Sequence, residues 1–165
     1  MQPNLLVTYN PAHPGKAERE VRAILDDFGK FEIIDATTPG VFLLHAQDVK
    51  KTVIKLKKMP ADTYEYTYKW VPIDKWVKSG IEEISNVLQE YNEEIGEHES
   101  WRLMLFKRMY HEHDTINLIR ILTENISREN VNLENPDKIV VVEIIGEKAG
   151  LSLLEKGEYL DTQKL

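Results

Sequence analysis

Apolar and polar residues in the first part of the chain alternate between strand-like and helix-like patterns. Residues 4–10 (NLLVTYN) form a short apolar run closed by the turn-forming NPAHPG, which predicts a strand. Residues 15–29 place apolar side chains at helical spacing and stop at a glycine, which predicts a helix. Residues 30–46 (KFEIIDATTPGVFLLHA) contain two apolar runs separated by ThrThrProGly, and this pattern predicts a β-hairpin.

The next segments continue this alternation and complete one predicted domain. Residues 48–59 (DVKKTVIKLKKM) alternate apolar residues with lysines, which predicts an amphipathic helix with Asp48 as its N-cap. Residues 63–73 (TYEYTYKWVPI) alternate Tyr and Trp with polar residues, as a half-buried strand does. The resulting order β-α-β-β-α-β predicts a ferredoxin-like domain over residues 1–78.

The second part opens with a predicted helix and continues with a basic strand. Ser79 followed by Glu82 fits a capping box, and apolar residues at helical spacing then run to Ile95. The next segment, 100–109 (SWRLMLFKRM), predicts a strand. Because residues 1–78 form the first domain, we expect a second domain over residues 79–165.

Two further patterns define the predicted sheet of this second domain. Residues 113–127 (HDTINLIRILTENIS) have helical spacing, with Asp114 as the expected cap. Residues 139–145 (IVVVEII) form a nearly continuous apolar, β-branched run, as in strands whose two faces are both covered. The β-α-β order over residues 101–145 predicts two parallel strands with a right-handed crossover, and residues 151–156 (LSLLEK) favour a further strand. The whole chain is therefore predicted to be an α+β protein with a partly parallel second sheet.

Composition excludes several classes of protein. The chain has 165 residues, 42% hydrophobic and 30% charged, which is enough for one substantial core or two small ones. No apolar run approaches the roughly 20 residues of a transmembrane helix, and the N-terminal MQPNLLVTYNP predicts no signal peptide. With no cysteine, disulfides, thiolate metal sites and cysteine nucleophiles are excluded, and we expect a cytoplasmic protein.

Charge is sorted along the sequence, although the net charge is -7. Residues 1–78 contain 12 Lys/Arg and 10 Asp/Glu, whereas residues 79–165 contain 9 Lys/Arg and 18 Asp/Glu. Within the second part, residues 82–99 carry seven acids and no Lys or Arg, and residues 100–110 (SWRLMLFKRMY) carry three basic residues and no acid. Sorting of this kind can create a local patch of one sign on an otherwise anionic protein.

The motifs of common enzyme classes are absent. The segment His111–Asp114 (HEHD) lacks the HExxH spacing of a zinc site, so a polar turn is favoured. No GxSxG elbow supports Ser/His/Asp catalysis. Residues 146–150 (GEKAG) lack the GK[ST] of a phosphate-binding P-loop, and they predict a tight turn with Lys148 at its tip, a lysine that could still meet a phosphate. We expect no cofactor and no metal.

The basic strand is the strongest candidate site from the residues alone. Alternation in a strand places Arg102 and Arg108 on one side and Lys107 on the other. Guanidinium groups on a rigid strand make good phosphate clamps. The alternative is that these arginines pair with glutamates of the preceding helix, and composition does not choose between the two.

Two other features of the first part could either bind a ligand or have an ordinary structural role. The aromatic row at residues 64–70 could stack nucleobases, although such a row more often belongs to the core or rim of a sheet. Lys51, Lys55 and Lys58 share a helical face that is either solubilising or basic enough to help bind a polyanion.

The second part resembles the THUMP domain, a tRNA-binding module of enzymes that thiolate, methylate or acetylate tRNA. The resemblance lies in WRLMLFKRMY, a helix, and VNLENPDKIVVVEIIGEKAGLSLL in fixed order. The most specific piece is Val131–Asn132–Leu133 through Pro136–Asp137, running into IVVVEI and closing with Gly150–Leu151. The first part is similar to the ferredoxin-like domain that usually precedes THUMP. Together they cover almost the whole chain.

The resemblance implies a role in tRNA modification. No methyltransferase, deaminase or pyrophosphatase domain is present, which is similar to stand-alone THUMP proteins, with archaeal relatives, that assist N4-acetylcytidine formation beside a separate acetyltransferase. It implies a non-catalytic protein that grips the acceptor stem and 3′ end of tRNA. The implied loop-shaping residues are 135–137, and the implied RNA contacts are Arg102, Lys107, Arg108, Lys148, Lys51, Lys55 and Lys58. The alternative is an interaction protein that docks a basic partner through the acidic helix 81–99 without binding RNA.

Overall fold

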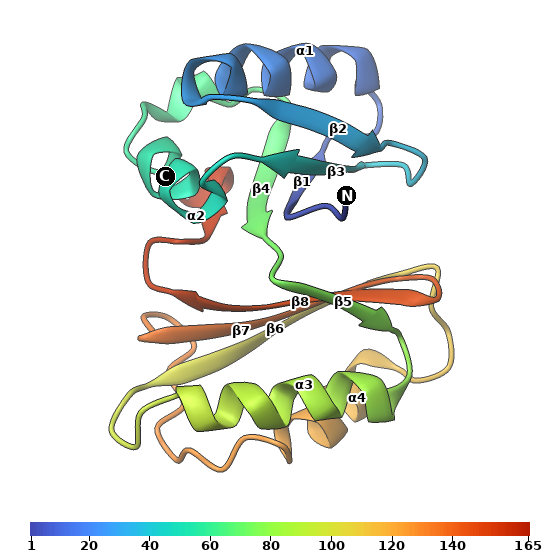
Figure 1. The fold of residues 1–165 in the computed structure, drawn as a ribbon, viewed down its shortest axis with the longest axis vertical. Helices are drawn as coiled ribbons and strands as arrows, with labels where there is room; N and C mark the ends of the chain where they lie inside the picture. The colour runs from blue at the N-terminus through green and yellow to red at the C-terminus, as the bar shows by residue number, and fades with distance from the viewer. The chain divides into compact units, whose positions relative to one another are not determined.

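The structure, a computed structural model, describes residues 1–165 as two compact units. Unit 1 consists of residues 1–73 together with residues 157–165, and unit 2 consists of residues 74–156 (Figure 1). The division therefore falls at 73/74 and 156/157, whereas the sequence pattern predicts a single boundary at 78/79. Hydrogen bonding explains the difference, because residues 75–78 pair with a strand of unit 2 and residues 160–161 pair with a strand of unit 1.

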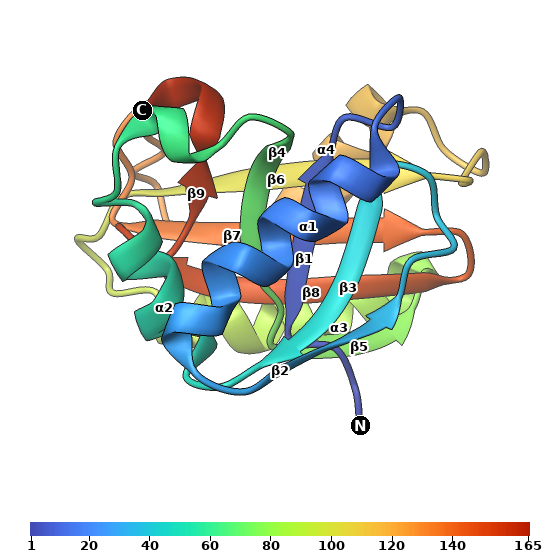
Figure 2. The same cartoon turned by 90° about the horizontal axis from the view of Figure 1, so that it is seen from above.

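Unit 1 follows the predicted β-α-β-β-α-β order and adds one short strand from the end of the chain. Its sheet has the order β2-β3-β1-β4-β9, every neighbouring pair is antiparallel, and α1 and α2 lie on the same face of the sheet (Figure 2). This is the predicted ferredoxin-like arrangement. The elements are β1 (Leu5–Tyr9), α1 (Pro14–Leu25), η1 (Asp26–Phe28), β2 (Phe31–Asp35), β3 (Val41–Ala46), α2 (Val49–Leu56), η2 (Ala61–Thr63), β4 (Thr67–Pro72), β9 (Leu160–Asp161) and η3 (Thr162–Lys164).

Two local expectations for unit 1 are corrected by the structure. Asp48 stands at the N-cap of α2 but has a left-handed backbone (φ 45°), and its side chain makes no capping hydrogen bond. The aromatic row is not one strand face, because β4 begins only at Thr67. Trp70 is fully buried, and Tyr64, almost fully buried, packs edge-on against it and donates its hydroxyl to the carbonyl of Leu56. These two rings belong to the core rather than to a stacking platform.

A carboxylate of α1 holds the start of β4 in place. Glu20 accepts hydrogen bonds from the backbone N–H groups of Glu65, Tyr66 and Thr67, at donor–acceptor distances of 2.7–3.2 Å. Consecutive N–H groups that point at one site form an anion-binding concavity, and here the anion is supplied by the chain itself. The bonds join segments about 45 residues apart in sequence, so they fix helix α1 to the sheet.

Replacing Glu20 by alanine is expected to lower the free energy of unfolding by about 2 kcal/mol, because it leaves backbone N–H groups without an acceptor. Urea denaturation measures this loss. The matched control is Glu18→Ala, which removes only an exposed ion pair with Arg22 and should cost less than about 0.5 kcal/mol. Equal losses in the two variants would contradict the role of Glu20.

Unit 2 is a four-stranded mixed sheet with two helices on one face (Figure 1). The strand order is β5-β8-β7-β6; β6 and β7 are parallel, as predicted, and the other two pairs are antiparallel. None of the helices of the chain combines the length and apolar character needed to cross a membrane. The elements are β5 (Lys75–Lys78), α3 (Ile81–Glu94), β6 (Trp101–Arg108), α4 (Thr115–Thr123), β7 (Lys138–Ile145) and β8 (Lys148–Glu155).

The helix caps of unit 2 confirm one prediction and correct another. Asp114 caps α4 as expected, because its side chain accepts a hydrogen bond from the backbone N–H of Asn117 at 2.8 Å. The predicted capping box at α3 is wrong. Gly80 is the N-cap, and the hydroxyl of Ser79 donates to the carbonyl of Gly146 at 2.8 Å instead. Ser79 therefore ties the end of β5 to the turn between β7 and β8.

The loop before β7 is held against the start of β6. Asn132 accepts hydrogen bonds from the backbone N–H groups of residues 134 and 135 within the loop, and Pro136 is buried. Asp137 accepts from both the backbone N–H and the hydroxyl of Ser100, at 2.8 and 3.2 Å. Residues 135–137 thus shape the loop, as the resemblance implied.

The Asp137 clamp is expected to open in acid. The backbone N–H of Ser100, followed by its hydroxyl, holds the pKa of Asp137 below its usual range. A lowered pKa means that the carboxylate stabilises the folded loop above the pKa of the unfolded chain, and that this stabilisation is lost below about pH 4. The NMR shift of the Ser100 amide should report the transition. An unchanged transition in Asp137→Asn, which cannot titrate, would contradict this assignment.

Candidate nucleic-acid interface

The alternation of side chains on β6 divides the predicted basic residues between two faces of the unit 2 sheet. The residues of β6 that pack with α3 and α4 are Trp101, Leu103 and Leu105. Lys107 continues this set and lies on the helix-covered face. Arg102 and Arg108 therefore lie on the opposite face, and the predicted alternation is confirmed.

The register of the sheet brings three cations into one row. Arg108 of β6 is paired with Ile145 of β7, Ile145 with Lys148 of β8, and Lys148 with Lys78 of β5. All four side chains lie on the face opposite the helices, because their neighbours Val77, Ala149 and Ile144 pack toward α3 and α4. We call Lys78, Lys148 and Arg108 the cation row. Neighbouring strands are about 4.8 Å apart, so the row extends over about 14 Å.

Two members of the row, Arg108 and Lys148, are each held by a neighbouring side chain. An Nη1 atom of Arg108 lies 3.2 Å from Oε2 of Glu143; the Arg108 side chain is 27% exposed and that of Glu143 is fully buried. A guanidinium has five N–H donors, so this bond fixes the group and still leaves donors for an anion. Nζ of Lys148 lies 5.3 Å from the ring centroid of Trp76, within the range of a cation–π contact.

Lys78 and Lys148 bring two positive charges together at one end of the row. Both residues are exposed, and they lie directly opposite each other in an antiparallel pair. Like charges in that position destabilise a sheet. An anion close to both ammonium groups would reduce this repulsion.

The turn around Gly146 differs from the expectation. Lys148 is the first residue of β8, not the tip of the turn, which consists of Gly146 and Glu147. Gly146 has the left-handed φ of 58° that the tight turn requires. Its N–H donates to the carbonyl of Arg108 at 2.8 Å, so this amide holds the end of β6 and is not available for a phosphate.

Two other predicted residues hold loops. Arg102 donates from Nη1 to the carbonyl of Leu133 at 2.6 Å, and Lys107 donates from Nζ to the carbonyl of His113 at 2.9 Å. Arg102 is six residues from Arg108 on β6, about 20 Å at the rise of a strand. Neither residue pairs with the glutamates of α3, and neither belongs to the cation row.

The remaining predicted residues lie in unit 1. Lys51 and Lys55 are on α2, and Lys58 follows its C-terminal end. All three side chains are exposed and make no ion pair. Lys51 and Lys55 therefore share an exposed face of α2, and Lys58 adds a positive charge just beyond its end.

Acidic residues of unit 2 gather on its helical side. Unit 2 contains 10 Lys/Arg and 17 Asp/Glu, and α3 alone has five glutamates and no basic residue. Two acids near α3 are paired, Glu90 with Lys75 and Glu99 with Lys138. The glutamates of α3 therefore lie on the opposite side of the sheet from the cation row.

The ion pair of Arg108 with Glu143 gives a direct test of this arrangement. Arg108→Ala removes the cation that lies 3.2 Å from a buried carboxylate, and the free energy of unfolding is expected to fall by about 2–3 kcal/mol. Adding Glu143→Gln removes the charge of that carboxylate and should restore at least half of that loss. Urea denaturation of the two variants measures both effects, and additive losses would contradict the coupling.

The comparisons with known proteins agree with this fold. Residues 105–154 match the family model of the THUMP domain, a stretch that runs from β6 to β8 and contains two members of the cation row. A search of curated protein sequences found no match.

Three solved structures are similar over most of this chain. PH1313 from Pyrococcus horikoshii has a TM-score of 0.65 at 15% identity and covers 96% of this chain and 55% of that chain. TrmN from Thermus thermophilus has a TM-score of 0.58 at 20% identity and covers 90% of this chain and 44% of that chain. A 4-thiouridine synthetase in complex with RNA and bound ATP has a TM-score of 0.56 at 17% identity and covers 98% of this chain and 42% of that chain. This chain thus spans about half the length of those chains or less. At these identities the likeness shows a shared fold, and the stretch of unit 2 from residue 105 to residue 154 is similar to the THUMP domain.

Proposed function

We propose that this protein binds tRNA through the cation row and presents it to a separate modifying enzyme. The observation that carries the proposal is the placement of Lys78, Lys148 and Arg108 in one register row on the face of the unit 2 sheet opposite the helices, with Ile145 between Lys148 and Arg108. The similarity of unit 2 to the THUMP domain supports RNA as the polyanion. A solved structure of similar fold is a 4-thiouridine synthetase bound to RNA.

The geometry of the row suits the backbone of a nucleic acid. Its length of about 14 Å allows more than one phosphate of the same strand to contact it. Lysine and arginine side chains on strands contact phosphates but do not read base edges, so the protein recognises shape rather than sequence. We therefore propose the acceptor stem and 3′ end of tRNA, whose shape is common to all tRNAs, as the bound region.

The second part of the proposal is that this protein binds tRNA but does not itself catalyse the modification. We propose that catalysis belongs to a partner enzyme, a cytidine acetyltransferase, on the resemblance to stand-alone THUMP proteins. The exposed lysines of α2, Lys51, Lys55 and Lys58, are proposed as a second RNA contact in unit 1. Arg102 and Lys107 act in this scheme by holding the loops at the two ends of β6.

Removing two charges from the row tests the proposal. Lys78→Gln with Lys148→Gln is expected to weaken tRNA binding by about tenfold or more at low salt. The slope of log affinity against log salt should fall by about 0.7–0.9 for each phosphate that the variant no longer neutralises. A filter-binding or mobility-shift titration with bulk tRNA across salt concentrations measures both.

The matched control removes the same charge elsewhere in unit 2. Arg120 and Lys156 are exposed and lie outside the row, so replacing both by glutamine should leave binding within about twofold of the wild type. Equal losses in the two double variants would mean that net charge, not the row, determines affinity. An affinity for tRNA that does not change with salt concentration would refute the phosphate contacts altogether.

A protein-docking function is the alternative that one observation favours. Glu82, Glu93 and Glu94 of α3 are exposed and make no ion pair, so they form an acidic face that suits a basic partner. Under this alternative the protein retains its partner enzyme in a pull-down and does not shift tRNA. Glutamine variants of α3 would then abolish partner capture and leave the cation row without a role.

A further inference from the structure

The strand β6 forms one margin of the unit 2 sheet (yellow in Figure 2), and most of its outer edge is unpaired. Its first residue, Trp101, exchanges two backbone hydrogen bonds with the loop before β7 on that edge. Because backbone groups point to alternate sides along a strand, Leu103, Leu105 and Lys107 direct theirs to the same edge. These three residues make no backbone hydrogen bond there. The outer edge of β6 is therefore a template for a further strand.

The other sheet edges of the protein are shorter or interrupted. β2 has five residues and a register shift between Ile33 and Asp35, β5 has four residues with a lysine at each end, and β9 has two residues. Short length, irregularity and lysine are common ways to keep an edge strand from pairing. β6 has eight residues and pairs with β7 without a register shift. It is the edge of this protein that can best accept another strand.

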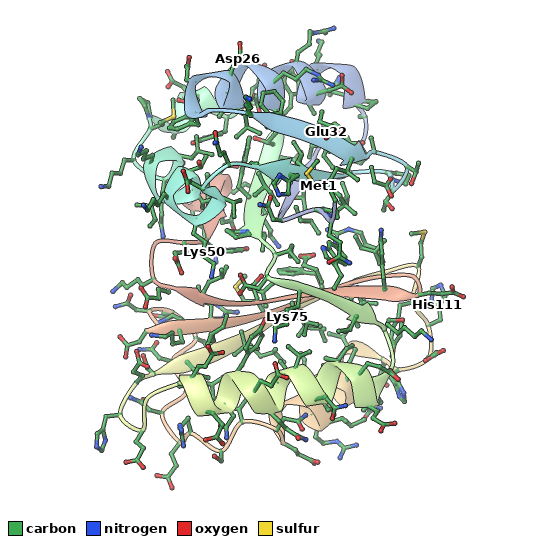
Figure 3. All side chains as sticks on the ribbon, in the orientation of Figure 1. Met1, Asp26, Glu32, Lys50, Lys75 and His111 are labelled. Carbon is green, nitrogen blue, oxygen red and sulfur yellow. The ribbon has the colours of Figure 1, made fainter.

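Exposed apolar side chains gather around β6 and its neighbours in the chain. The protein has eight exposed large hydrophobic residues, and five of them belong to the end of β6, to α4 or to the loop before β7: Met109, Ile116, Ile119, Val131 and Leu133. His111, labelled in Figure 3, marks the segment that joins β6 to α4. Single exposed apolar residues are ordinary, but a group of them in one region marks an interaction surface.

The isoleucines of α4 face away from α3. Asn125, just after α4, donates to Ser85 and accepts from Gln89 of α3, at 3.1 and 3.0 Å. With about 100° between successive residues, Ile119 lies about 120° and Ile116 about 180° around the helix from Asn125. α4 packs on β6, whereas α3 packs on β5 and β8. Because β6 is the margin of the sheet, the side of α4 that faces away from α3 lies toward the open edge.

The charges of β6 define what can pair with it. The strand carries three cations and no acid: Arg102 lies near its start, Lys107 and Arg108 lie at its end, and residues 103–106 between them are apolar. An added strand gains most when its centre is apolar and its ends are acidic. A second copy of β6 fits poorly, because an antiparallel pair centred on Leu105 would set Arg102 of each copy opposite Arg108 of the other.

We propose that the open edge of β6 binds an extended segment of a partner protein, apolar and β-branched at its centre and acidic at its ends, as a fifth strand of the unit 2 sheet. The outward backbone groups of β6 hold the segment, and its apolar side chains pack against Ile116 and Ile119. Arg102 and Lys107 each donate to one loop carbonyl and keep further donors for its carboxylates. The inference goes beyond the proposed function, because it concerns a protein partner and does not depend on RNA. It also differs from the acidic face of α3, which suits a basic partner.

The first test is a titration with a short synthetic peptide that has β-branched residues at its centre and two glutamates at each end. Fluorescence anisotropy of the labelled peptide is expected to show saturable binding. The same peptide with lysine in place of each glutamate should bind at least about tenfold more weakly. Ile116→Gln with Ile119→Gln should weaken binding of the acidic peptide about five- to tenfold. The matched control, Ile34→Gln with Leu165→Gln, replaces two other exposed apolar residues and should bind like the wild type.

Hydrogen exchange followed by NMR distinguishes strand addition from simple apolar contact. With the acidic peptide bound, the amides of Leu103, Leu105 and Lys107 should exchange at least about tenfold more slowly, because they then donate to the added strand. Unchanged exchange at these amides, or slowing confined to the edges of β2 or β5, would overturn the proposal. The wild-type chain carries this test, so it does not depend on whether a variant folds.

The remaining outcomes decide between occupants. Absence of peptide binding, or equal affinity for the glutamate and lysine peptides, rejects the proposed segment. Slow exchange of the same amides without peptide, increasing with protein concentration, means that a second copy occupies the edge and also rejects it. None of these results alters the tRNA titration of the Lys78/Lys148 variant, so failure of the edge and failure of the proposed function are separate findings.

Discussion

Strand register in unit 2 is the constraint on which the candidate interface depends. Parallel pairing aligns Arg108 with Ile145, and two antiparallel pairings carry the alignment to Lys148 and Lys78. A slip of one residue in any of these pairs would turn a cation toward the helix-covered core, where an unpaired charge is very costly. Val140, Val142 and Ile144 of β7 oppose that slip, because the same alternation places them against α3 and α4. Packing of the core thus determines the placement of the charges.

The sequence predicted the elements well because their signals are local. Helical spacing and β-branched runs gave the order of the longer helices and strands but missed the short strands β5 and β9, and the parallel pairing of β6 and β7 followed from the β-α-β order. The errors come from long-range pairing. Lys78 was assigned to the end of the first domain, and only its pairing with Lys148, 70 residues later, makes it part of the row. Likewise, Ser79 resembles a helix cap by spacing alone but bonds to the distant Gly146.

The contacts of the candidate site residues could not be predicted from the sequence, for a related reason. A basic residue in a sequence window has the same appearance whether its charge is offered to solvent or used within the fold. Arg102 and Lys107 donate to backbone carbonyls of loops that lie 31 and 6 residues away in sequence, and the pattern of the strand does not predict these acceptors. Glu143 stands in a continuous apolar run, and that is the one available signal. A single acid in such a run indicates a buried partner of opposite charge.

The pairing of β9 with β4 makes unit 1 discontinuous in sequence, since residues 74–156 intervene between its two parts. During synthesis, β4 emerges well before β9, so one edge of the unit 1 sheet stays unpaired while the whole of unit 2 is translated. Completion of the unit 1 sheet therefore depends on synthesis of unit 2. A ribosome that stalls within unit 2 releases a product with an open sheet edge, which is prone to aggregation and visible to quality control.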